Sequence, residues 1–156
     1  MSGALSGRVA LVTGGGAGIG AGIARRFADE DARVVVAEFD ADAGAAVADE
    51  IDGLFVQTDV ARREQVENAV AAALSEYGAL DILVNNAWGG GAIGRVENKT
   101  DDQLAHGFAV GYYGPFWAMR AALPSMKERG WGRVINMCSL NGVNAHMGSL
   151  EYNAAK

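Results

Sequence analysis

The chain of 156 residues is long enough for one domain, and 50% hydrophobic with 21% charged residues is typical of a folded protein. The net charge of −6 argues against a nucleic-acid or anionic-membrane partner, because either would favour a basic face. The one cysteine, Cys138, excludes an intramolecular disulfide and is expected to be a buried small apolar residue. His106 and His146 lack partners at ligand spacing, so no metal site is predicted. The first residues do not resemble a signal peptide and no apolar run approaches the ~20 residues that span a bilayer, so a cytoplasmic protein is expected.

The first predicted element is a strand at residues 8–13, followed by a glycine-rich turn and an amphipathic helix. Ile19, Ile23 and Phe27 recur at every fourth position, which indicates one apolar face of a helix. A helix start collects unpaired backbone N–H groups, and glycines let the backbone approach an anion closely. The turn is therefore predicted to bind a pyrophosphate, with a flexible surface loop as the alternative. The residues predicted to contact a cofactor in this turn are Thr13, Gly14, Gly16, Ala17, Gly18, Ile19 and Gly20.

Strands and helices alternate along the rest of the chain. Short β-branched or apolar runs predict further strands at residues 33–38, 54–57, 81–85 and 132–137. Helical patterns occupy residues 41–50, 62–77 and 101–129, and Pro124 is expected to kink or interrupt the last of these. Strands separated by helices indicate βαβ units. The predicted fold class is therefore α/β, a doubly wound parallel sheet with helices on both faces, in a single domain.

Polar residues stand where the predicted strands end. Glu38 ends the second strand, Asp59 follows the third, Asn85 and Asn86 end the fourth, and Ser139 follows the fifth. In an open parallel sheet, ligands bind outside the carboxyl ends of the strands, where an acidic side chain can accept hydrogen bonds from an adenosine ribose. Each residue also has a structural alternative, since aspartate caps helices and asparagine forms turns. Their convergence on one edge of the sheet favours a binding site.

The last predicted element carries Tyr152 and, four residues later, Lys156. On a helix, residues at this spacing share a face. A neighbouring ammonium stabilises the phenolate form of a tyrosine, which suits the phenol for acid–base catalysis. A surface tyrosine and lysine on a helix are the alternative for this spacing taken by itself.

Taken together, these motifs closely resemble the short-chain dehydrogenase/reductase family, and the resemblance covers essentially the whole chain. It implies a Rossmann-type fold and hydride transfer between a nicotinamide cofactor and a small alcohol or ketone substrate. In that family the serine binds the substrate oxygen, the tyrosine is the general acid/base, and the lysine holds the nicotinamide ribose. These roles carry over to Ser139, Tyr152 and Lys156. The resemblance also implies that Asp59 and Val60 meet the adenine and that Asn86 and Ala87 meet the ribose side of the cofactor.

Two residues depart from the pattern of the family. Gly111 stands where family members often have an asparagine that supports a proton relay. Trp88 stands where the family usually has glycine after Asn86 and Ala87, so a large ring is expected to crowd the nicotinamide pocket or to wall off the substrate. Both departures bear on activity more than on the fold.

The chain also ends early by the standard of the family. Family members usually continue well beyond the lysine and there supply two more strands, a substrate-covering loop and an oligomer interface. We therefore expect residues 1–156 to be the N-terminal part of a longer enzyme, with the C-terminal strands missing and the longer form a homo-oligomer, a dimer or tetramer. On this basis the chain alone is expected to bind NADH weakly and to show no measurable carbonyl reduction.

The sequence thus favours an NAD(H)-linked alcohol dehydrogenase or ketoreductase. NAD is expected to be preferred over NADP because Glu38 would repel a 2′-phosphate and neither the glycine turn nor Phe39 supplies a cation. A 3-oxoacyl-thioester reductase of the same family is one alternative. A catalytically silent nucleotide-binding or interaction protein is the other, favoured by Gly111 and by the early end.

Overall fold

The structure is a computed structural model that describes residues 3–89, 91 and 93–156. Each predicted strand is present within a residue or two of its expected bounds. The strands are β1 (Val9–Thr13), β2 (Arg33–Glu38), β3 (Leu54–Gln57), β4 (Ile82–Asn85) and β5 (Arg133–Asn136). The α-helices are α1 (Gly18–Asp29), α2 (Ala41–Glu50), α3 (Arg63–Tyr77), α4 (Asp101–Phe108), α5 (Gly114–Glu128) and α6 (Leu150–Ala155). Short 3₁₀ turns are η1 (Val96–Asn98) and η3 (Leu140–Gly142), and η2 (Ala109–Tyr113) is π-helical.

The five strands form one parallel sheet in the order β3-β2-β1-β4-β5. The chain first runs outward from β1 through β2 to β3 and then returns to place β4 on the other side of β1. The strand order therefore reverses between β1 and β4, which is the point where a doubly wound sheet leaves a crevice outside its strand ends. The predicted Rossmann-type fold is confirmed.

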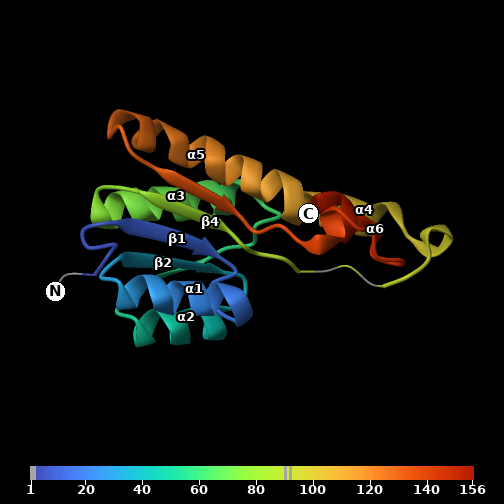
Figure 1. Cartoon of the computed structure of the whole chain (residues 1–156), viewed down its shortest axis with the longest axis horizontal. Helices are drawn as coiled ribbons and strands as arrows, with labels where there is room; N and C mark the ends of the chain where they lie inside the picture. The colour runs from blue at the N-terminus through green and yellow to red at the C-terminus, as the bar shows by residue number, and fades with distance from the viewer. Residues whose placement is uncertain (1–2, 90, 92) are drawn as a thin grey trace.

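Helices cover both faces of this sheet (Figure 1). One core forms between the sheet and helices α3 and α5, and a second forms between the sheet and helices α1 and α2. Successive residues of β1 serve opposite faces, since Leu11 packs in the first core and Ala10 and Val12 pack in the second. This double burial explains why the strands are continuous apolar runs rather than alternating ones. In the described part of the chain, no helix combines the length and apolarity that a bilayer-spanning segment needs.

The long helix expected at residues 101–129 is divided, but not at Pro124. The division lies at η2, where five residues adopt π-helical geometry between α4 and α5. Helix α5 continues past Pro124 as far as Glu128, so an interruption at the proline was a wrong alternative. A single π-helical turn inside a longer helix frequently occurs at a functional site. Here it contains Gly111, the residue that departs from the family pattern.

Beyond the carboxyl ends of the strands, α4, α6 and the turns between them form an extension of the molecule (Figure 1). A buried ion pair joins two of its segments, because Lys99 Nζ lies 2.8 Å from Glu151 Oε1 with side chains 3% and 1% exposed. The hydrogen bond from the Lys99 ammonium lowers the pKa of Glu151. The second carboxylate oxygen of Glu151 is buried and has no hydrogen-bond partner among the described residues. Glu151 directly precedes Tyr152, so this pair anchors the start of α6 within the extension.

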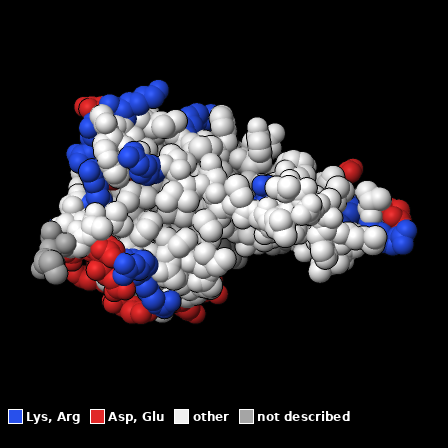
Figure 2. Space-filling view, in the orientation of Figure 1, with Lys and Arg blue, Asp and Glu red and all other residues white. Residues whose placement is uncertain are grey.

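Charged side chains are distributed unevenly over the face drawn in Figure 2. They gather around the end of the sheet opposite the extension and again at the tip of the extension. Acidic and basic residues are mixed in both places. The surface between them, over the carboxyl ends of the strands, is mostly uncharged on this face. On this face, charged residues therefore lie on both sides of the surface over the strand ends, and the described residues form no basic or acidic patch across it.

Candidate active site

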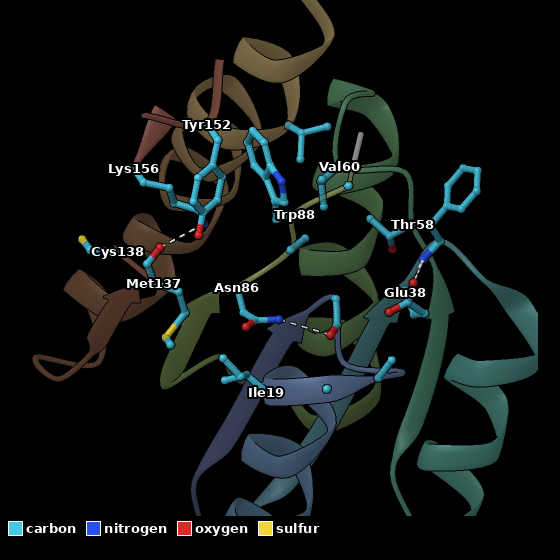
Figure 3. A pocket seen from close by; sticks show the side chains of 17 residues that line it. Ile19, Glu38, Thr58, Val60, Asn86, Trp88, Met137, Cys138, Tyr152 and Lys156 are labelled. Carbon is cyan, nitrogen blue, oxygen red and sulfur yellow. Dashed lines mark hydrogen bonds between the residues drawn. The ribbon is translucent and has the colours of Figure 1, made fainter. Parts of the chain in front are cut away.

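A cavity of about 460 Å³ lies at the carboxyl ends of β1, β2 and β4. Figure 3 shows its lining, with Glu38 and Thr58 toward one end and Trp88, Tyr152 and Lys156 toward the other. Most of the residues predicted to contact a cofactor line it. These are Gly14, Ala17, Gly18, Ile19, Glu38, Val60, Asn86, Ala87, Tyr152 and Lys156. Thr13, Gly16, Gly20, Asp59 and Ser139 are not among the lining residues, and each has another visible role.

The glycine turn has the backbone geometry that its composition suggests. Gly14 and Gly18 have φ angles of +64° and +53°, in the left-handed region that residues with a side chain rarely adopt. Ala17 is the N-cap of α1 and has no polar side chain to bind the first N–H groups of the helix. These groups therefore remain directed at the cavity, where a helix start favours an anion such as a pyrophosphate.

Gly16 and Gly20 act through close packing instead. A Cβ on Gly20 would lie 2.5 Å from the Nδ2 atom of Asn86 and would collide with the Gly14 carbonyl. A Cβ on Gly16 would lie 2.7 Å from the Glu38 side chain. Both glycines therefore bring the turn against its neighbours without lining the cavity themselves.

Thr13 and Asn86 lock the ends of β1 and β4 together. The Thr13 hydroxyl accepts hydrogen bonds from the backbone N–H groups of Asn86 and Ala87 at 3.0 and 3.1 Å. In return, the Asn86 side-chain amide donates to the carbonyl oxygens of Thr13 and Gly14 at 2.9 and 3.2 Å. Thr13 is buried and does not line the cavity, so these hydrogen bonds hold the glycine turn in place while its contact with a cofactor stays a prediction.

Glu38 is fixed at the opposite end of the cavity by backbone amides. Its carboxylate accepts hydrogen bonds from the N–H groups of Gly16 at 3.0 Å, Phe39 at 2.7 Å and Asp40 at 3.1 Å. A carboxylate offers about four acceptor positions. At least one therefore remains for a hydroxyl group of a ligand, while the carboxylate itself is held by the glycine turn.

The residues after β3 separate into two environments. Val60 lines the cavity, but the Asp59 carboxylate accepts a hydrogen bond from the Ala61 N–H at 2.9 Å and forms an ion pair with Arg62. Asp59 lies instead in a neighbouring pocket of about 340 Å³ that shares Phe39 with the main cavity. The alternative in which Asp59 caps the following helix is not present either, because Arg62 is the N-cap of α3 and no described side chain caps it. Asp59 instead closes a turn ahead of the helix through the Ala61 N–H.

Tyr152 and Lys156 reach the cavity from α6. The Lys156 N–H donates to the Tyr152 carbonyl at 3.1 Å, so the two residues lie one helical turn apart, as their spacing predicts. The Lys156 ammonium donates to the carbonyl oxygen of Met137 at 3.0 Å and lies 5.9 Å from the centre of the Tyr152 ring. Burial lowers the pKa of Lys156, an effect that the nearby Cys138 opposes. A cationic side chain is thus held beside the phenol, at the carboxyl end of β5.

Ser139 occupies the turn between β5 and α6. Its hydroxyl oxygen accepts a hydrogen bond from the Asn141 N–H at 3.2 Å, which caps η3. Gly142 of the same turn packs so closely on the backbone of Lys156 that a Cβ there would lie 2.5 Å from it. The hydroxyl hydrogen of Ser139 is not used by this cap and remains able to donate a hydrogen bond.

Trp88 is wedged between two glycines beside Tyr152. The two rings meet edge to face, with centroids 4.8 Å apart and an interplanar angle of 64°. A Cβ on Gly111 would lie 2.9 Å from Cζ3 of Trp88 and would collide with Ala155, and a Cβ on Gly91 would lie 3.5 Å from Cζ2 of Trp88. The two departures from the family pattern are therefore in contact, and the ring of one occupies the space that a side chain at the other would need.

The sequence motifs did not point to several lining residues. Phe39, Thr58, Met137 and Cys138 all line the cavity, and each stands within two residues of a predicted site residue at the end of a strand. Their signal was therefore position, not residue type. Cys138 is exposed, so its expected burial was wrong. Among the described residues, no group of three or more histidine, cysteine, aspartate or glutamate side chains is placed to hold a metal ion.

The fold and the cavity define a Rossmann-type domain with its site at the switch point of the sheet. Residues 8–156 match the family model described as short chain dehydrogenase. The chain belongs to the short-chain dehydrogenase family.

Two curated relatives and one solved structure illustrate the similarity. The 2,5-dichloro-2,5-cyclohexadiene-1,4-diol dehydrogenase LinX of Sphingobium indicum is 36% identical over 163 residues, which cover 100% of this chain and 64% of LinX. The D-beta-hydroxybutyrate dehydrogenase of Cupriavidus necator is 38% identical over 157 residues, with 97% and 60% covered. The crystal structure of 3-ketoacyl-(acyl-carrier-protein) reductase from Brucella melitensis complexed with NADH has a TM-score of 0.93 and 35% identity, with 97% of this chain and 65% of that chain covered. The chain thus spans less than two thirds of the length of these proteins.

Proposed function

We propose that this chain provides the cofactor site and the acid–base residues of an NAD(H)-linked alcohol dehydrogenase or carbonyl reductase. The observation that carries the proposal is the meeting of two motifs in one cavity. The glycine turn and Glu38 line one part of it, and Tyr152 and Lys156 line another, although about a hundred residues of sequence separate Glu38 from Tyr152.

The lining residues fit a nicotinamide dinucleotide. The start of α1 offers unpaired N–H groups to a pyrophosphate, and Gly18 has open space where a Cβ would stand. Glu38 would accept a ribose hydroxyl at the adenosine end, and Lys156 would donate to the ribose at the other end. When bound, the nicotinamide supplies or accepts the hydride. The NADH-bound structure of the Brucella melitensis reductase supports this assignment.

The proton is handled by the chain's own residues. Tyr152 would donate its phenolic proton to the carbonyl oxygen during reduction and would take it back during oxidation. The Lys156 ammonium, held by the Met137 carbonyl, would stabilise the phenolate that remains. The Ser139 hydroxyl would donate a hydrogen bond to the same substrate oxygen and so polarise the bond that reacts.

Glu38 favours NAD over NADP in this scheme. Its carboxylate is held at the adenosine end, where a 2′-phosphate would bring a second negative charge. Among the described residues that line the cavity, the cationic side chain is Lys156, and it lies at the other end (Figure 3). A phosphate would therefore be repelled without a compensating partner.

A 3-oxoacyl-thioester reductase is the second candidate, because the similar protein from Brucella melitensis is a 3-ketoacyl-(acyl-carrier-protein) reductase. A substrate panel with simple ketones, cyclic alcohols and a 3-oxoacyl thioester would separate the two. The homo-oligomer implied by the family resemblance stays a prediction, which light scattering of the purified protein would check.

The test begins with a titration of the protein with NADH, followed by NADPH, using the fluorescence of the reduced nicotinamide. We expect saturable NADH binding that is tighter than NADPH binding. Reduction of at least one carbonyl compound of the panel is expected from a form as long as the relatives, and not from residues 1–156 alone. Absence of NADH binding by a folded sample would refute the proposal. Binding without turnover on any carbonyl by that longer form would instead favour the silent nucleotide-binding protein.

A further inference from the structure

Trp88 lies on the boundary between two cavities. One is the main cavity, and the other is a pocket of about 360 Å³, here called the side pocket, whose lining includes Ile93, Asn141 and His146. Trp88 and Tyr152 line both of them. Figure 3 shows the two rings side by side above Asn86. Two adjoining aromatic side chains therefore form the partition at the position where the acid–base residue would meet its substrate.

The indole of Trp88 packs against the backbone of two glycines, Gly91 and Gly111. The benzo ring of Trp88 reaches 2.9 Å and 3.5 Å from the places where Cβ atoms of Gly111 and Gly91 would stand. Glycine at these two places leaves the room that the indole fills. The π-helical geometry of η2 places the backbone of Gly111 at this contact. The ring thus packs against the backbone of both glycines, with the Tyr152 ring in edge-to-face contact and the Lys156 ammonium 5.7 Å from its centre.

We propose that Trp88 is the specificity-determining residue of this site, and that Gly111 provides the surface against which its indole packs. The indole closes the main cavity from the side pocket, so the substrate beside Tyr152 is limited to compounds narrow enough to stay on one side of the partition. This inference rests on the proposed function. Removal of the ring would join the two cavities and would admit a substrate whose bulk extends into the side pocket.

The first test uses the full-length form in which turnover is expected, and compares two ketones that differ in width, cyclohexanone and the bicyclic 1-decalone. In Trp88→Ala, the ratio of kcat/KM for 1-decalone to that for cyclohexanone should rise about tenfold or more, since a change in pocket contacts has effects of this size. Trp88→Phe, which keeps a smaller ring, should give an intermediate ratio. Trp131→Phe is the matched control, because Trp131 lies before β5 at the opposite end of the strands, under the guanidinium of Arg8. An unchanged ratio in Trp88→Ala would overturn the assignment.

The second test probes the contact between Gly111 and Trp88 through protein stability and does not depend on enzyme activity. Gly111→Ala should lower the midpoint of denaturation because the added methyl group meets both Trp88 and Ala155. In the Trp88→Ala background one of these collisions is gone, so the same substitution should lower the midpoint less. Equal shifts of the denaturation midpoint in the two backgrounds would show that Gly111 does not position the indole of Trp88.

The two tests separate this inference from the proposed function. Failure of the wild-type protein to bind NADH counts against the proposed function, and the midpoint comparison then decides whether Trp88 and Gly111 are paired. NADH binding with an unchanged ketone ratio counts against the role of Trp88 alone.

Discussion

The two halves of the main cavity are built in different ways. In the glycine half, formed by Gly14, Gly18 and Glu38, the groups that face the cavity are fixed by backbone geometry and by backbone N–H groups. In the tyrosine half, formed by Trp88, Tyr152 and Lys156, they are fixed by contacts between side chains and distant segments. The first half follows from the sheet itself. The second depends on the extension staying in place, so damage to the extension should affect the tyrosine half selectively.

Loss of the phenolic proton should separate the two halves most sharply. In Tyr152→Phe of a full-length form, turnover should fall by roughly 10²–10⁴-fold, the contribution typical of general acid–base catalysis, while the glycine half still binds NADH. Steady-state kinetics and an NADH titration on the same sample would measure both. Tyr112→Phe is a suitable control, because Tyr112 is 60% exposed and does not line the main cavity. Substantial turnover in Tyr152→Phe would exclude Tyr152 as the acid/base and direct attention to Tyr112 or Tyr113.

Removal of the buried Lys99 ammonium should destabilise the extension that positions the tyrosine half. Lys99→Met leaves the Glu151 carboxylate buried without its ion-pair partner, and the loss of one member of such a pair costs about 3–5 kcal/mol of stability. Chemical denaturation would measure the loss. The matched control is Arg25→Gln, which breaks the Arg25–Glu50 pair on the surface, where the two side chains are 45% and 54% exposed. That change should cost at most about 1 kcal/mol, and equal costs for the two variants would show that the buried pair is no anchor.

Changes to Glu38 should act on the glycine half alone. Glu38→Ala removes the proposed charged acceptor of the adenosine ribose, whose loss is expected to cost about 1.5–3 kcal/mol, and removes the proposed repulsion of a 2′-phosphate. The ratio of the Kd values for NADPH and NADH should therefore move toward one. Glu38→Gln keeps the shape of the side chain and an acceptor for the Gly16 N–H, so it isolates the part due to charge. A ratio that does not move in either variant would mean that Glu38 does not select the cofactor.

Acid should weaken the tyrosine half by protonating Glu151 of the buried ion pair. The Lys99 hydrogen bond holds the pKa of Glu151 below its ordinary value of 4.5, so between these two values the unfolded chain binds more protons than the folded chain. The free energy of unfolding should therefore fall as the pH drops below 4.5 through the pKa of the folded state, by about 1.4 kcal/mol for each unit that separates the two pKa values. Denaturation curves at several acidic pH values would show it. In Lys99→Met this contribution to the pH dependence should disappear.

The same division explains how far the sequence could predict the molecule. The glycine turn, Glu38 and the strand ends were predictable because each depends on residues close together in sequence and on the parallel order of the strands. The spacing of Tyr152 and Lys156 was likewise sufficient to place both on one helix. The pairing of Trp88 with Gly111 was not predictable, because it joins the end of β4 to the middle of a helix and depends on the π-helical turn at η2.

For Asp59, the local sequence was compatible with two different roles. Its position after a strand suited both a ligand contact and a cap, and sequence alone did not decide between them. Its carboxylate turns to the Ala61 N–H and to Arg62 within the next few residues. Local hydrogen bonds of this kind compete with ligand binding and become visible only when the backbone of the turn is known. The buried pair of Lys99 and Glu151 had no signal in the sequence for a similar reason, since 52 residues separate its members.

The thiol of Cys138 allows the tyrosine half of the cavity to be labelled chemically. It is the one cysteine of the sequence, it is exposed, and it lines the main cavity together with Lys156. A maleimide dye would therefore attach at one defined position without any engineered residue, and its emission would report on the part of the cavity near Lys156. Protection of this thiol from alkylation would measure occupancy by any compound, coloured or colourless, including those that never react.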